Sequence, residues 1–291
     1  NPQQAAAVTH SGTPLLVVAG AGSGKTRVLT SRIAYLMAAR GVDPHEILAI
    51  TFTNKAAGEM KERVAQLVGN RAKIIWVSTF HSASVRILRQ EAGRLGYKST
   101  FSIYDQADSL RLITLVMRDL NLDPKRYNPR GVASVISGAK NDLLGPSDYR
   151  NATQNSFEEV VAEIYAIYQA RLTSANAMDF DDLIMKTVDL LQKFPEARSR
   201  YRHRFKHILV DEYQDTNHAQ YILIRELVGS DREGIPAAEL CVVGDADQSI
   251  YGFRGATIRN IMAFEEDYPD AQTILLEQNY RSTQNILSAA N

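Results

Sequence analysis

The stretch Leu15-Leu16-Val17-Val18-Ala19-Gly20-Ala21-Gly22-Ser23-Gly24-Lys25-Thr26 joins an apolar run to a glycine-rich turn that ends in lysine and threonine. Four consecutive apolar residues are typical of a strand that is buried on both faces. Apolar side chains then recur at helical spacing, at Leu29, Ile33, Leu36 and Met37. The sequence therefore predicts a strand, a tight loop and a helix in succession.

The turn Ala19–Thr26 has the spacing G-x-x-x-x-G-K-[ST] of a phosphate-binding loop, with Ala19 in place of the first glycine. Glycines let backbone N–H groups close around phosphate oxygens, and the N-terminus of the next helix adds a favourable field. Lys25 would place its charge on the β- and γ-phosphates of ATP, and the Thr26 hydroxyl would ligate Mg²⁺. A flexible turn before an ordinary helix is the alternative, but the strand–loop–helix context favours the nucleotide site.

A second strand candidate ends in two adjacent acids, in the run Ile208-Leu209-Val210-Asp211-Glu212. Neighbouring carboxylates are costly unless a cation or a reaction uses them. Asp211 would hold Mg²⁺ directly or through water, and Glu212 would orient and deprotonate an attacking water. A surface turn explains this run equally well when it is taken alone, but the Lys25 loop favours the functional interpretation.

Other apolar runs predict the remaining strands of a parallel sheet. Several of these runs end in a polar or small residue, and ligands of open α/β sheets bind beyond the carboxyl ends of the strands. The additional predicted strands are Ile47–Ile50, Ile74–Val77, Leu240–Val243 and Thr273–Leu276.

In the long segment Phe80–Phe205, apolar residues at helical spacing predict helices. One helix, capped by Asp105, carries an apolar stripe at Leu110, Ile113, Met117 and Leu120. Glu158–Leu172 repeats this pattern, and loops are expected at Asn121–Pro129 and Leu144–Asn155. The predicted fold class is α/β, with an all-helical subdomain inserted into a parallel-sheet domain.

The composition is that of a globular protein, because 45% of the 291 residues are apolar and 23% are charged. No apolar run approaches the roughly 20 residues that a membrane helix needs, and no signal peptide is recognised. The single cysteine excludes a disulfide framework and favours a reducing, cytoplasmic location. With 33 basic and 33 acidic residues, net charge gives no support for a nucleic-acid partner, so such a site must be local.

Several motifs occur in a fixed order and together resemble superfamily 1 DNA helicases of the UvrD/PcrA/Rep group. The resemblance covers the chain from Asn1 to Asn291 and implies a RecA-like motor domain. Its motifs are Gln4, the loop Ala19–Thr26, Thr51–Ala57, Thr79-Phe80-His81, Asp211-Glu212-Tyr213-Gln214-Asp215-Thr216, Gly244–Ala256 and Gln278-Asn279-Tyr280-Arg281-Ser282.

The resemblance implies roles around ATP. Gln4 would read adenine and Tyr280 would stack on it, while Gln248 would sense the γ-phosphate and Arg281 would stabilise the transferring charge. The implied catalytic residues are Lys25, Glu212, Gln248 and Arg281. The implied ATP-binding residues are Gln4, Ala19, Gly20, Ala21, Gly22, Ser23, Gly24, Lys25, Thr26, Tyr280 and Arg281.

The resemblance also implies a groove for single-stranded DNA. Aromatic faces stack on any base, and hydroxyls and amides hold backbone phosphates. The implied residues are Phe52, Thr53, Asn54, Thr79, His81, Tyr251, Phe253 and Arg254. Each also has an ordinary structural interpretation: the two phenylalanines as core, His81 as a helix cap and Tyr251 as a gap-filler. Phe253 stands where the family often has tryptophan, so base stacking would be weaker there.

Two further segments are candidate DNA contacts. The basic run Arg198–Lys206 is either a DNA patch or a solvated face that leads into the Ile208 strand. Lys140 and Asn141, in the helical segment, could touch duplex DNA ahead of the motor. The segment Gly229–Glu239 is expected to be a solvated loop.

The resemblance implies a discontinuous motor domain at 1–80 and 206–274 and a helical insert at 81–205. Residues 275–291 would begin a second motor domain, and the motifs expected beyond it are not in this sequence. The chain is therefore expected to be an N-terminal fragment that does not unwind duplex DNA alone, because unwinding needs two motor domains.

The expected function is that of an ATP-dependent DNA helicase and single-stranded DNA translocase that uses Mg²⁺. The resemblance implies 3′ to 5′ polarity, action at single-strand/duplex junctions and a role in DNA repair or replication restart. It also names excision-repair proteins or RNA polymerase as candidate partners. The alternatives are the helicase part of a helicase–nuclease, a DNA-binding module with a regulatory ATP site, and a P-loop ATPase with a protein substrate.

Overall fold

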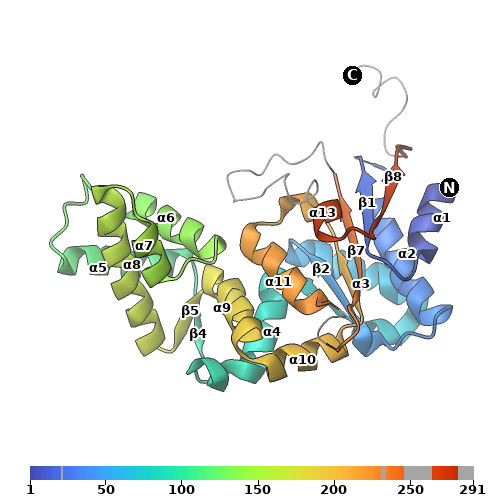
Figure 1. The fold of residues 1–291 in the computed structure, drawn as a ribbon, viewed down its shortest axis with the longest axis horizontal. Coiled ribbons are helices and arrows are strands. Elements are labelled where there is room, and N and C mark those ends of the chain that lie inside the picture. Colours follow the sequence, from blue (N-terminus) through green and yellow to red (C-terminus); the bar gives the residue numbers. More distant parts are fainter. Residues whose placement is uncertain (21, 231–233, 246–263, 281–291) are drawn as a thin grey trace, which may run out of the picture. The chain divides into compact units, whose positions relative to one another are not determined.

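Figure 1 shows the computed structural model, which describes residues 1–20, 22–230, 234–245 and 264–280. The described backbone forms two compact units. One contains Asn1–Ala83, Arg198–Thr216 and the described residues from Ile224 on, and the other contains Ser84–Ala197 and Asn217–Leu223. We call them the sheet unit and the helical unit.

The sheet unit is built on a six-stranded sheet in the order β3-β2-β6-β7-β1-β8. Every pairing between neighbouring strands is parallel. The strands are β1 (Leu15–Ala19), β2 (Ile47–Thr51), β3 (Trp76–Thr79), β6 (His207–Val210), β7 (Glu239–Gly244) and β8 (Gln272–Leu276). The predicted α/β class with a parallel sheet is confirmed, and the order brings the carboxyl ends of β6, β7 and β1 side by side.

Helices precede and follow these strands. They are α1 (Pro2–Thr9), α2 (Lys25–Ala38), α3 (Asn54–Val68), α4 (Phe80–Glu91), α10 (Pro195–Arg204), α11 (His218–Val228) and α13 (Phe264–Asp267), of which α4, α10 and α11 carry residues of both units. α3 begins where the Thr53 side chain accepts a hydrogen bond from the Ala56 N–H, the usual role of an N-cap threonine. Short 3₁₀ turns lie at Pro44–Glu46, Gly69–Lys73, Ala92–Leu95 and Tyr213–Asp215.

Both faces of the sheet are covered. Leu209, Cys241 and Val243 share one apolar cluster with side chains of α2 and α3. Their neighbours along the strands are equally buried but lie outside that cluster, at Ile208, Val210, Leu240 and Val242. Because side chains alternate across a strand, these four face the other side of the sheet. This explains why the strands appear in the sequence as continuous apolar runs.

The helical unit consists mainly of α5 (Gln106–Asp119), α6 (Pro129–Asn141), α7 (Pro146–Ala152), α8 (Ser156–Ser174) and α9 (Phe180–Lys193). The predicted cap Asp105 is confirmed: its side chain accepts from the Asp108 N–H, and Asp108 in turn accepts from the Asp105 N–H. Apolar side chains of α5, α6 and α8 form the main core of the unit.

Three expectations for secondary structure were wrong. β3 begins at Trp76, not Ile74, because the 3₁₀ turn Gly69–Lys73 delays the strand and leaves Ile74 39% exposed. The loop expected at Leu144–Asn155 contains α7, which starts with Pro146 at a position where proline favours a helix. The helical segment also contains two short paired strands, β4 (Ser102–Tyr104) and β5 (Ala177–Asp179), too short to give a sequence signal.

A buried ionic cluster lies inside the helical unit. Lys140, on α6, is fully buried, and its Nζ lies 2.7 Å from Asp179 Oδ2 and 3.0 Å from Asp182 Oδ1. Tyr168 donates a hydrogen bond to the same Asp179 oxygen at 2.7 Å. Lys140 therefore cannot reach DNA, and that hypothesis was wrong. Asn141 accepts a hydrogen bond from Asn217 at 2.9 Å.

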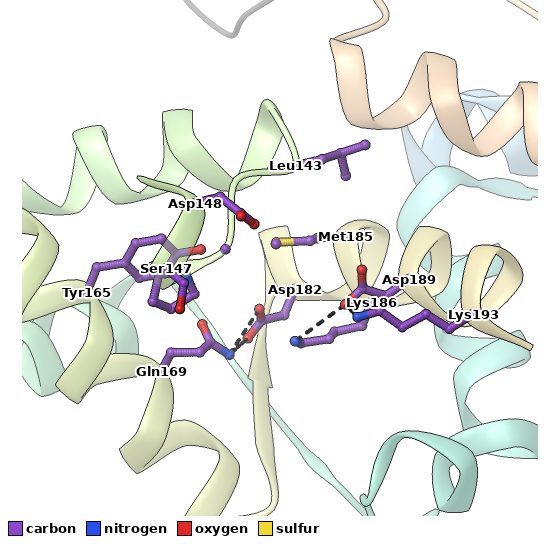
Figure 2. Close-up of a pocket in the computed structure, with 12 residues that line it drawn as sticks. Leu143, Ser147, Asp148, Tyr165, Gln169, Asp182, Met185, Lys186, Asp189 and Lys193 are labelled. Carbon is purple, nitrogen blue, oxygen red and sulfur yellow. Dashed lines mark hydrogen bonds and ion pairs between the residues drawn. The ribbon is translucent and has the colours of Figure 1, made fainter. Parts of the chain in front are cut away.

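A cavity of about 240 Å³ opens beside this cluster within the helical unit (Figure 2). Its lining includes Tyr165, Gln169, Asp182, Met185 and Lys186. Gln169 Nε2 donates to both carboxylate oxygens of Asp182, at 3.1 and 3.3 Å. The residues that line the cavity include none of the predicted nucleotide- or DNA-binding residues.

Asp181, on α9, has a carboxyl group whose pKa is changed by burial within the helical unit. Burial, reinforced by the charge of Asp179, raises the pKa of Asp181 from 3.8 to about 6. Because the folded-state pKa is raised, the contribution of Asp181 to the free energy of unfolding is fully present below pH ~4 and is lost as the pH rises through ~6. We expect Asp181→Asn to stabilise the protein by about 1–3 kcal/mol at pH 7 and to have little effect near pH 4.

Chemical denaturation of both proteins between pH 4 and 8 measures this difference. Asp148→Asn, at an exposed position on α7, is the control and should show no such rise with pH. A difference for Asp181→Asn that does not change with pH would contradict the explanation by burial.

Candidate nucleotide site and DNA-binding residues

The glycine-rich turn connects β1 to α2 as expected. Gly22 and Gly24 have φ values of +77° and +89°, which glycine adopts without steric cost. The Ser23 hydroxyl donates to the Gly20 carbonyl at 2.7 Å and tightens the turn. Gly24 is the N-cap residue of α2 and has no side chain to cap the first N–H groups. Such N–H groups at a helix N-terminus are suited to binding an anion.

Lys25 meets carboxylates from two other strand ends. Its Nζ lies 3.3 Å from Asp245 Oδ2, beyond β7, and 3.4 Å from Glu212 Oε2, beyond β6. The Lys25 side chain is 11% exposed and that of Asp245 is 2% exposed, so these charges interact with little screening by water. Three neighbouring strands thus place a cation between two acids.

Asp211 and Thr26 form the second part of the site. Asp211 is buried, and the Thr26 side chain lies near enough to its carboxylate to favour the charged form. Burial, with a further contribution from the Glu212 charge, raises the pKa of Asp211 to about 6. A carboxylate and a hydroxyl are oxygen donors of the kind that Mg²⁺ prefers, so the residues present fit this ion.

Glu212 has an uncommon backbone conformation. Its φ is +49°, in the left-handed region, and its N–H donates to Asp211 Oδ1 at 3.0 Å. A residue other than glycine held there costs of order 1–3 kcal/mol, and such strain tends to occur at functional sites. The conformation leaves the Glu212 side chain 38% exposed, whereas Asp211 beside it is buried.

The predicted adenine-binding residues also lie against the loop. Gln4, on α1, donates from Nε2 to the Ser23 carbonyl at 2.9 Å. The Tyr280 N–H donates to the Gly22 carbonyl at 2.9 Å, and the Tyr280 side chain is exposed. Gln278 accepts from the Tyr280 hydroxyl at 2.8 Å and from Asn1 Nδ2 at 3.3 Å. Segments from both ends of the described chain therefore border the turn.

Several predicted DNA-binding residues lie at the carboxyl ends of β2 and β3 or just beyond them. Phe52 is half-buried and packs edge-on against Phe80, with ring centroids 5.4 Å apart, while Thr53 and Asn54 are exposed. The Thr79 hydroxyl accepts from the Ser82 N–H at 3.2 Å, so Thr79 caps the start of α4 rather than His81. Burial lowers the pKa of His81, which favours the neutral ring. Ala21, Gln248, Tyr251, Phe253, Arg254 and Arg281 lie outside the described residues.

Comparison with known proteins gives a consistent result. A family model described as the UvrD/REP helicase N-terminal domain matches residues 1–269. The chain belongs to the UvrD/REP helicase family. Relatives in this family include the ATP-dependent DNA helicase UvrD1 of Mycobacterium tuberculosis, 66% identical, and that of Mycobacterium leprae, 60% identical. The ATP-dependent DNA helicase PcrA of Bacillus subtilis is 54% identical.

Each of these relatives matches over the whole of this chain. The chain spans only 38–39% of the length of these UvrD/REP relatives.

Sequence reasoning did not assign a role to two polar residues of the site in this UvrD/REP family member. Gln214 is buried; its Nε2 donates to Glu212 Oε2 at 2.8 Å, and its Oε1 accepts from the Asp245 N–H at 3.0 Å. Gln214 thus links the two acids that face Lys25. Both Gln214 and Asp245 stand in quoted motifs, but only the strand order shows that they meet.

The basic run Arg198–Lys206 is largely occupied by internal contacts. Arg202 is buried and donates from Nε to the Glu226 carbonyl at 2.8 Å. The Arg204 guanidinium lies over the Trp76 ring, 4.6 Å from its centroid, and Lys206 pairs with Glu46. These contacts favour a structural role for the run. An exposed aromatic side chain that the sequence analysis did not single out is Phe180, which is 48% exposed at the start of α9.

Within the described residues, no helix is both long enough and apolar enough to span a membrane.

Proposed function

We propose that this chain binds and hydrolyses ATP as the first motor domain of an ATP-dependent DNA helicase. The observation that carries the proposal is the meeting of Lys25, Asp211 and Glu212 at the carboxyl ends of β1 and β6. A cation, an oxygen-donor pair and an exposed carboxylate beside a helix N-terminus are the parts that phosphoryl transfer requires. The names of the UvrD1 and PcrA relatives support the same activity.

Each residue has a distinct part in the proposed reaction. Lys25 would leave its two carboxylate partners, bind phosphate oxygens and offset the negative charge of the phosphates. Asp211 and Thr26 would hold Mg²⁺, which when bound neutralises charge on the phosphates. Glu212 would orient the attacking water and accept its proton. Asp245 and Gln214 would keep Lys25 and Glu212 in place before the nucleotide binds.

The proposed DNA ligand is single-stranded DNA or a single-strand/duplex junction. Phe52, Thr53, Asn54, Thr79 and His81 support it, because an aromatic face and polar groups occur together beyond β2 and β3. Tyr251, Phe253 and Arg254 remain predictions, as do Gln248 and Arg281 at the γ-phosphate. Polarity from 3′ to 5′, a role in repair or replication restart and partners such as excision-repair proteins or RNA polymerase rest on the family resemblance. A cytoplasmic location rests on the single cysteine.

Replacing Lys25 with methionine tests the nucleotide site. We expect the affinity for ATP to fall by about 10- to 100-fold, because charge-assisted hydrogen bonds are worth about 1.5–3 kcal/mol. Titration of a fluorescent ATP analogue measures binding, and phosphate release with and without oligo-dT measures turnover. Lys61→Met, at an exposed position on α3, is the control. Unchanged affinity in a folded Lys25→Met protein would contradict the proposed site.

A further inference from the structure

α1, the helix that carries Gln4, has little apolar attachment to the protein. It is eight residues long; Ala7 is its one buried residue, and Val8 packs partly buried against the same core. Helices of this length are not stable alone in water, and most helical stability in proteins comes from packing of an apolar face. The position of α1 must therefore depend strongly on polar contacts.

Arg32, on α2, supplies most of these contacts. Its Nη1 donates to the carbonyls of Ala7 at 3.1 Å, Val8 at 3.3 Å and His10 at 2.7 Å. The Ala7 and Val8 carbonyls belong to the last turn of α1, whose carbonyls have no partner within the helix. A cation at a helix C-terminus is also favoured by the helix dipole. The Arg32 side chain is 2% exposed, and Nη2 lies 3.5 Å from Glu239 Oε2.

The other end of α1 lies directly against the glycine-rich turn. A Cβ atom built on Gly24 would be 2.9 Å from Gln4 Nε2, closer than atoms normally approach. Since Gln4 Nε2 also donates to the Ser23 carbonyl, a shift of α1 by about an ångström would break this contact. A displacement of the C-terminal turn of α1, which Arg32 holds, would therefore also displace Gln4 in its N-terminal turn.

The remaining hydrogen-bonding capacity of Gln4 suits adenine. One of its two amide hydrogens faces Ser23, which leaves one donor and the amide oxygen. Adenine offers the complementary pair, an N7 acceptor and an N6 donor, whereas guanine offers two acceptors, N7 and O6. The distinction depends on the position of the amide, and hence on the position of α1.

We infer that Arg32 is a positioning residue for base selection: by capping α1 it holds the Gln4 amide where it can distinguish adenine from guanine. The inference rests on the proposed ATP site. Arg32 contacts the carbonyls of the last turn of α1 and is not among the residues proposed to bind the nucleotide.

The test compares binding of fluorescent ATP and GTP analogues to Arg32→Gln and to the unmodified chain. We expect the dissociation constant for ATP to rise about tenfold and that for GTP to change less than twofold, so that base preference is lost. Arg40→Gln is the matched control. Arg40 pairs with the same Glu239 at 2.7 and 2.8 Å, but these hydrogen bonds do not involve α1, so base preference should persist.

Two further measurements keep the inference testable if Arg32→Gln folds poorly. Arg32→Lys retains the positive charge but lacks the planar guanidinium with its several donors. This variant should lose part of the preference for ATP over GTP. Hydrogen exchange of the α1 amides needs no nucleotide, and should be faster in Arg32→Gln or Arg32→Lys than in Arg40→Gln. Equal α1 exchange in the arginine variants would overturn the inference.

A double-mutant cycle with Gln4→Ala separates positioning from general destabilisation. If Arg32 acts through Gln4, Arg32→Gln should cause no further loss of base preference once Gln4 is alanine. If Arg32→Gln caused the same loss of ATP preference with Gln4 present and with Gln4→Ala, the inference would be overturned. A folded Arg32→Gln protein that kept the full preference for ATP over GTP would overturn it too. Failure of the unmodified chain to bind ATP would instead contradict the proposed function, and the exchange experiment would still test the cap.

Discussion

Replacing Glu212 with glutamine is expected to slow ATP turnover by roughly 10²- to 10⁴-fold while ATP still binds, the range typical of a lost general base. Glutamine has the same shape and keeps one side-chain oxygen to accept the hydrogen bond from Gln214. The substitution therefore removes the proton acceptor and one charge near Lys25, but it keeps the side-chain shape and the hydrogen bond from Gln214. ATP should bind and persist unhydrolysed.

Single-turnover hydrolysis measured in the presence of oligo-dT, together with binding of the fluorescent ATP analogue, tests this expectation. Glu62→Gln, an exposed position on α3, is the control for loss of one carboxylate. Turnover within a few-fold of the unmodified protein would show that Glu212 is not the base. In a DNA-binding module with a regulatory ATP site, DNA affinity and function should be indifferent to the substitution.

The parts of the site that sequence could predict are those encoded locally. The strand, turn and helix around Lys25 follow one another within a dozen residues, and the acids after β6 follow their strand directly. The meeting of Lys25, Asp245 and Gln214 could not be predicted in this way. It depends on the order β6-β7-β1, in which strands distant in sequence become neighbours.

The misassignment of Lys140 has a similar cause. Lysine side chains are usually solvated, so the residue type alone gave no reason against a DNA contact. A signal against this was present, because Val132, Ile136 and Lys140 follow one another at intervals of four and so share a helix face. Val132 and Ile136 are buried in the core. The carboxylates that make burial of the charge tolerable lie some 40 residues further along the chain, and their proximity cannot be read from the pattern of α6 alone.

Replacing Lys140 with methionine is expected to destabilise the helical unit by about 3–5 kcal/mol. Burial alone would lower the pKa of Lys140, but the charges of Asp182 and Asp179 outweigh it and raise the pKa, so the amine is charged. Methionine would fill most of the volume but leave both carboxylates without their cation. The cost is therefore that of uncompensated buried charge rather than of a cavity.

The measurement must report on the helical unit itself. The sole tryptophan, Trp76, lies in the sheet unit, so hydrogen exchange of α6 and α9 is a better probe than tryptophan fluorescence. Lys193→Met is the matched control, because that side chain is 64% exposed and its pair with Asp189 should contribute less than about 1 kcal/mol. Adding Asp182→Asn to Lys140→Met should restore part of the lost stability, since it removes one of the two buried carboxylates that have lost their cation. If the double variant were as unstable as the sum of the two single variants, the cost would arise from lost packing, and the ionic explanation of the cluster would fail.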